Sequence, residues 1–143
     1  PNAPNVIHWH VEFTIDLRDV DTVSMENALA DIRNAIENVA RRRGLEFNIR
    51  LLSSSAPIAL SSSLVQQLEA IAESLGISYM RLPSGAVHDA GILAQMTEVG
   101  MIFIPSRGGR SHCPEEFSSI EDIKRGTDVL LHALIQLARS GRA

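Results

Sequence analysis

Two polar loops carry the histidines that could do chemistry. His88 lies in the segment 84–90 (SGAVHDA) and His112 in the segment 105–116 (PSRGGRSHCPEE), each following a predicted strand. A neutral imidazole can bind zinc or a related divalent ion, but zinc usually takes three or four protein ligands. From the residues alone, His112 is therefore either one metal ligand or a solvent-facing loop histidine that caps the next helix.

Neighbouring groups leave further alternatives open. Asp89 could orient His88 or could serve as a carboxylate in the first turn of a helix. Cys113 stands next to His112, but adjacent residues rarely face one another, so a catalytic cysteine is not expected. His132 falls within the last predicted helix, where a structural role is expected.

Arg18 is the best anion-binding side chain in the sequence. It lies on the polar face of the alternating segment 7–18, together with His8 and His10. Its guanidinium fork matches a carboxylate in bidentate geometry. The alternative is a surface ion pair with Asp16, Asp19 or Asp21.

Hydrophobic periodicity predicts the elements that position these residues. Alternation over 7–18 and 45–51 predicts two half-buried strands, separated by an amphipathic helix that begins at Asp21 or Ser24 and ends at Gly44. A Ser-rich stretch then suggests a domain boundary near residue 58. Helices are expected over 65–75, 90–99 and 120–137, with strands at 77–82 and 101–104. This order is typical of an α/β fold with a mostly parallel sheet, whose ligands bind at the carboxyl ends of strands.

Composition excludes several classes of function. The chain has 143 residues, 13 basic and 17 acidic, and a net charge of -4, so no basic field favours nucleic acid. Apolar runs such as 101–105 fall far short of the roughly 18 residues that span a bilayer, so no membrane partner is expected. A single cysteine gives no sign of an oxidising compartment, which makes a cytoplasmic location the default expectation.

Four motifs in order resemble one known family. They are residues 1–7 (PNAPNVI), 13–19 (FTIDLRD), 83–90 (PSGAVHDA) and 104–117 (IPSRGGRSHCPEEF). Together they are similar to the hydantoinase/carbamoylase branch of the M20-type metal-dependent amidohydrolases. That branch comprises N-carbamoyl-L-amino-acid hydrolases, allantoate amidohydrolases, ureidoglycolate hydrolases and β-ureidopropionases.

The resemblance implies roles for individual residues. His112 matches the family's last metal ligand, and Asn5 and Arg18 match the pair that holds the substrate's carboxylate in the active site of the partner subunit. The loop that lines the substrate pocket corresponds to Gly85, Ala86, Val87 and His88. Two departures stand out: Val87 replaces a glycine, which puts a close backbone approach in doubt if that position needs positive φ, and His8-Trp9 replaces Pro-Gly.

The resemblance also implies a larger protein. Residues 1–58 match the second half of a ferredoxin-like lid and dimerisation domain, and residues 59–143 match the C-terminal part of the catalytic domain. The remaining metal ligands and the proposed general base belong to a missing N-terminal half, so no catalytic residue is expected in this chain. The divalent ion (Zn, Mn, Co or Ni) is not expected to stay bound to this chain alone, which should be inactive by itself.

Two other functions remain open from the sequence. The chain could be a non-catalytic assembly module, that is, a split-gene subunit or a degenerate remnant that pairs through orphaned strand edges. It could also belong to an M20 peptidase. The amidohydrolase that the resemblance implies has three partners instead: the missing N-terminal half of the enzyme, a second copy that forms a homodimer through the lid, and a small carboxylate substrate.

Overall fold

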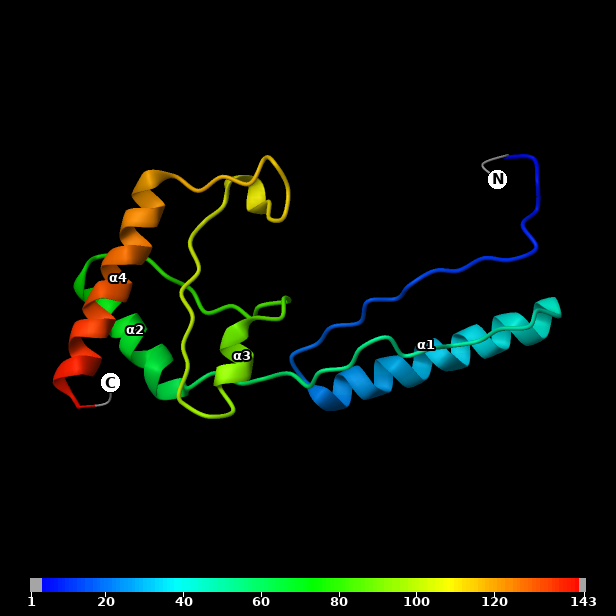
Figure 1. Cartoon of the computed structure of the whole chain (residues 1–143), viewed down its shortest axis with the longest axis horizontal. Helices are drawn as coiled ribbons and strands as arrows, with labels where there is room; N and C mark the ends of the chain where they lie inside the picture. Colours follow the sequence, from blue (N-terminus) through cyan, green and yellow to red (C-terminus); the bar gives the residue numbers. More distant parts are fainter. Residues whose placement is uncertain (1–3, 142–143) are drawn as a thin grey trace. The chain divides into compact units, whose positions relative to one another are not determined.

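The computed structural model describes residues 4–141, and the chain divides between Pro57 and Ile58 into two units. The first unit contains helix α1 (Thr22–Arg43), with non-helical chain before and after it (Figure 1). The second contains α2 (Ser62–Ser74), α3 (Asp89–Leu93), the 3₁₀ helix η1 (Arg107–Gly109) and α4 (Ile120–Arg139). Within residues 4–141, no helix is long and apolar enough to cross a membrane.

Helix α1 begins and ends where local sequence signals place it. The Asp21 carboxylate accepts the backbone N–H of Ser24 at 2.7 Å, which satisfies one of the free donors of the first turn. Gly44 ends the helix with φ 64°, the left-handed conformation that glycine adopts without strain, and its N–H donates to the Ala40 carbonyl. Both predicted boundaries are confirmed, with Asp21 rather than Ser24 as the N-cap.

The core of the second unit lies between α2 and α4, which pack against each other (Figure 1). Its buried members are Ile71, Ala72, Val129 and Ala133. The segment 101–104 lies directly against α4: a Cβ at Gly126 would be only 2.5 Å from Ile104 Cγ2. This packing fixes the chain just before the loop that carries His112.

The strands expected at 7–18, 45–51, 77–82 and 101–104 do not form in the described part of the chain. None of its residues belongs to a strand, and these segments are irregular chain. Alternation marks one face for burial, but a strand also needs a neighbour whose backbone groups complete the ladder. The β-α-β arrangement therefore stays a prediction.

The helix expected over 90–99 is wrong in its length, because α3 ends at Leu93. Turns follow as far as Met96, whose N–H donates to the Leu93 carbonyl at 2.9 Å. The Val99 carbonyl accepts the N–H of Ser61 at 3.0 Å, which ties the segment after α3 to the start of α2. Residues 94–99 thus form turns and irregular chain rather than helix.

An open apolar groove of about 420 Å³ lies along α2, the segment 100–104 and α4. Leu130 and Leu134 line it from α4 and remain about half exposed. Gln67 and Thr127 are the polar side chains in its lining. The groove is thus an apolar surface that no other described part of the chain covers.

Candidate functional site

Arg18 binds a carboxylate through two nitrogen atoms. Its Nε and Nη2 donate to the two oxygens of Asp16 at 2.9 and 2.6 Å. Both side chains are exposed, and their spacing of two residues puts them on one face of an extended segment. The hydrogen bond from Arg18 lowers the pKa of the Asp16 carboxyl, and the same bond raises the pKa of Arg18. The surface ion pair considered for Arg18 is therefore formed, and it uses the geometry that a substrate carboxylate would need.

Asn5 lies in an exposed turn of the same unit. The nearby His8 and His10 are also exposed, and the His10 ring lies 5.5 Å from that of Trp9. Asn5 and Arg18 thus belong to the first unit, whereas the other predicted site residues belong to the second.

The loop before α3 holds His88 by two contacts. Its Nε2 lies 2.6 Å from Ser84 Oγ, and its ring meets the edge of Phe103 with centroids 5.7 Å apart. Asp89 lies in the first turn of α3, the helix-terminus alternative considered for it. Neither Gly85 nor Val87 has a positive φ, so the valine fits this backbone without strain.

The loop that carries His112 is closed at its base by backbone and hydroxyl contacts. The Arg107 N–H donates to the Phe117 carbonyl at 2.8 Å, and Ser118 Oγ donates to the Pro105 carbonyl at 2.8 Å. Ser106 Oγ donates to the Arg110 carbonyl at 2.6 Å. The Arg107 guanidinium also lies 4.2 Å above the centre of the Phe117 ring. These bonds give the loop a defined shape although most of it is exposed.

His112 has a left-handed backbone conformation. Its φ is 58°, and among the described residues no other non-glycine has a positive φ. Its N–H donates to Glu116 Oε2 at 2.8 Å, which ties the backbone to the far side of the loop. Backbone strain of this kind concentrates at functional sites.

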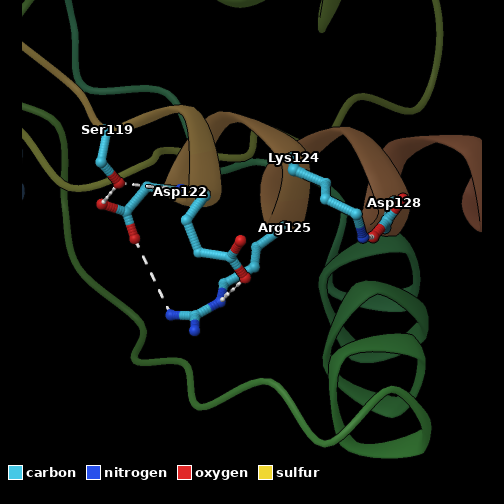
Figure 2. Close-up of polar contacts among 6 residues, drawn as sticks. Ser119, Asp122, Lys124, Arg125 and Asp128 are labelled. Carbon is cyan, nitrogen blue, oxygen red and sulfur yellow. Dashed lines mark hydrogen bonds and ion pairs between the residues drawn. The ribbon is translucent and has the colours of Figure 1, made fainter.

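The start of α4 anchors the end of this loop (Figure 2). Ser119 Oγ accepts the Asp122 N–H at 3.1 Å and donates to the Asp122 carboxylate at 2.6 Å. Arg125 pairs with Glu121 at 3.3 Å and with Asp122 at 3.9 Å, and Lys124 pairs with Asp128 one turn further on. The capped first turn fixes where the loop ends.

The residues present do not by themselves make a metal site. Within residues 4–141, no group of three or more His, Cys, Asp or Glu side chains is placed to hold an ion. Cys113 is a free thiol beside His112, and His132 Nδ1 lies 2.8 Å from the Asp128 carbonyl within α4, consistent with a structural role. Zinc usually takes three or four protein ligands, so His112 alone could not complete such a site.

Comparison with known proteins places the chain in a family. The family model described as peptidase family M20/M25/M40 matches residues 3–136. The chain belongs to this family.

Its relatives within M20/M25/M40 include named amidohydrolases. The chain is 38% identical to an N-carbamoyl-L-amino-acid amidohydrolase of Pseudomonas sp. strain NS671, over 95% of this chain and 33% of that protein. It is 33% identical to the allantoate amidohydrolase of Escherichia coli K12, over 96% of this chain and 34% of that protein. The chain thus spans about one third of the length of these curated relatives.

A solved structure from the same family shows the fold class. The structure is an amidase of the hydantoinase/carbamoylase family from Burkholderia vietnamiensis. It aligns with a TM-score of 0.73 and 33% identity, over 82% of this chain and 28% of that chain. This likeness supports an α/β-type fold and, together with the named relatives, confirms the family indicated by the four motifs.

Two residues that hold the site were missed in the sequence. Ser84 contacts the His88 ring, and Glu116 binds the His112 backbone. Each pair is four residues apart in a loop, where this spacing does not by itself bring side chains together. The turns that create both contacts depend on backbone dihedrals that residue types alone do not specify.

Proposed function

We propose that this chain is about one third of a divalent-metal-dependent amidohydrolase that cleaves a ureido or carbamoyl C–N bond. The similarity to relatives named for N-carbamoyl-L-amino acids and for allantoate supports this reaction class. The observation on this chain that carries the proposal is the Arg18 fork, which binds the Asp16 carboxylate through two nitrogens. Substrates of this class present a carboxylate to such a fork.

In the proposed enzyme, each part of the chain has a separate task. Asn5 and Arg18 bind the substrate's carboxylate, from a lid formed in part by residues 1–58 and shared across a homodimer. The loop that includes His88 lines the substrate pocket of the catalytic domain, to which residues 59–143 belong. His112 supplies one ligand to an ion whose other ligands come from the rest of the enzyme.

The proposal also assigns a cover to the apolar groove along α2 and α4. Curated relatives are about three times as long as this chain, so the complete enzyme has further polypeptide to pack there. Ile102 and Leu134 line the groove. In α/β domains, apolar side chains of this kind are typically buried, because both faces of the parallel sheet are covered. We expect the occupant to be the remaining catalytic domain of the same enzyme.

The test is steady-state hydrolysis of N-carbamoyl amino acids and allantoate by the complete enzyme carrying Arg18→Ala. Loss of a bidentate contact to a charged ligand should lower kcat/KM by about 10- to 100-fold. Arg33→Ala, which removes an exposed arginine from α1, is the matched control and should leave kcat/KM unchanged. An unchanged kcat/KM in Arg18→Ala would overturn the carboxylate-binding role.

A further inference from the structure

Ser84 and His88 form a close hydrogen-bonded pair in the loop before α3. The distance between Ser84 Oγ and His88 Nε2 is 2.6 Å, in a partly buried setting. The Ala86 N–H donates to the same Oγ at 3.2 Å, so the backbone of the loop holds the hydroxyl oxygen in place. The hydroxyl therefore has a fixed position from which to contact the imidazole.

The direction of the Ser84–His88 hydrogen bond sets which imidazole nitrogen carries the proton. A serine hydroxyl has one hydrogen to donate and two lone pairs that accept. The Ala86 N–H occupies one lone pair, and among the described contacts of Ser84 the acceptor available to its hydrogen is His88 Nε2. A neutral imidazole that accepts at Nε2 carries its proton on Nδ1.

We propose that Ser84 is a positioning residue that fixes His88 as the Nδ1–H tautomer, so that the ring offers an N–H donor to a ligand oxygen. The ligand chemistry is an oxygen acceptor, either a carboxylate or the carbonyl of a ureido group. This inference deepens the proposed function and rests on it for the identity of the ligand. Ser84 itself does not touch the ligand in this scheme.

Phe103 fixes the plane of the ring that Ser84 orients. The two rings meet at an interplanar angle of 63°, and the next residue, Ile104, packs directly against Gly126 of α4. The imidazole is thus held by a hydroxyl on its own loop and by an aromatic ring from a segment anchored to a helix. Holding a recognition group at two points reduces the entropy lost when a ligand binds.

The tautomer can be measured by NMR on the ¹⁵N-labelled 143-residue chain, from imidazole ¹H–¹⁵N correlations at pH 8. His132 is an internal reference, because its Nδ1 lies 2.8 Å from the Asp128 carbonyl oxygen. A carbonyl oxygen only accepts hydrogen bonds, so this contact requires a proton on Nδ1 of His132. His88 should show the same Nδ1–H pattern as His132. In Ser84→Ala, the His88 pattern should shift towards Nε2–H, whereas Ser84→Thr should keep the original pattern.

Controls separate this effect from a disturbed loop. Ser74→Ala, which removes a hydroxyl that donates to the Ile71 carbonyl in α2, should change neither histidine. A nuclear Overhauser contact between the His88 and Phe103 rings should persist in every variant. Absence of that contact in the unsubstituted chain, an Nε2–H pattern for His88, or an unchanged pattern in Ser84→Ala would each overturn the proposal.

In the complete enzyme, Ser84→Ala should raise KM several-fold with a smaller change in kcat, and Ser84→Thr should restore KM. A KM that Ser84→Thr fails to restore would contradict the tautomer role. Absence of any ureido hydrolysis would overturn the proposed function, while the spectra of the chain would still decide the tautomer. The two failures are therefore distinguishable.

Discussion

His112 has a backbone conformation that favours glycine, at the position proposed for a metal ligand. With φ at 58°, a residue that carries a Cβ is strained, whereas glycine is not. We predict that His112→Gly stabilises the fold although it removes the imidazole. His112→Ala removes the same imidazole but keeps the Cβ, so the strain should remain.

The magnitude follows from two opposing effects. The left-handed conformation costs a residue with a Cβ about 1–2 kcal/mol, with histidine among the residues that tolerate it better. Glycine offsets about 0.4–1 kcal/mol of this gain, because an unfolded chain with glycine at this position has more conformational freedom to lose on folding. His112→Gly should therefore raise the free energy of unfolding by about 0.5–1 kcal/mol, a few degrees in Tm. The bond to Glu116 comes from the backbone N–H and should survive in both variants.

Urea unfolding followed by circular dichroism measures both variants against the unsubstituted chain. Ser111→Gly is the matched control, because Ser111 is adjacent but has no positive φ, so glycine there should destabilise the fold. If His112→Ala proves as stable as His112→Gly, His112 is not left-handed in the protein. The backbone strain inferred at His112 would then be refuted.

Three further predictions concern packing, capping and pH. Gly126→Ala should destabilise the second unit by about 1–3 kcal/mol in urea unfolding, because the new Cβ would lie 2.5 Å from Ile104 Cγ2. In an Ile104→Ala background, which removes Cγ2, the same change should stabilise the unit by up to about 1 kcal/mol, because alanine favours a helix more than glycine does. Ser61→Ala removes the N-cap of α2 and should cost about 1 kcal/mol in thermal unfolding, and no loss would exclude the cap. The hydrogen bond from Arg81 lowers the pKa of Glu69 below 4.5, so the stability that this pair contributes should be present above pH 4.5 and lost as the pH falls through the pKa of Glu69 in the folded protein. Carboxyl titration by NMR should show that Arg81→Gln moves this pKa back up, and an unmoved pKa would contradict the pairing.

Helix ends could be predicted from the sequence because their causes are local. Asp21 caps α1 and Gly44 ends it through contacts within a few residues of the helix. Ser61 and Ser119 likewise accept backbone N–H groups in the first turns of α2 and α4. Such signals do not depend on the rest of the fold.

Elements that depend on distant partners could not be predicted in the same way. The alternating segment 7–18 has the pattern of a strand, but a ladder needs a neighbouring strand, and none forms within residues 4–141. Helix α3 ends at Leu93, and further along the chain the Val99 carbonyl accepts the N–H of Ser61, which is 38 residues earlier. Periodicity carries no information about either contact.

The site shows the same division between local and non-local causes. The sequence already allows Arg18 to pair with Asp16, because residues two apart in an extended segment share a face. The left-handed φ of His112 and the contact of Ser84 with His88 were not foreseen, since both arise from loop geometry. The motifs indicate the family, whereas the structure is needed to find the residues that hold His88 and His112.

The proposed function makes this chain part of an amidohydrolase that acts on ureido compounds. Its most direct test is to incubate the complete enzyme and a divalent ion with N-carbamoyl-L-amino acids and, separately, with dipeptides, and to quantify the released amino acid and ammonia. The proposed function predicts equal amounts of amino acid and ammonia from the carbamoyl substrates and little cleavage of dipeptides. Cleavage of dipeptides without release of ammonia from any carbamoyl substrate would contradict it and would favour a peptidase.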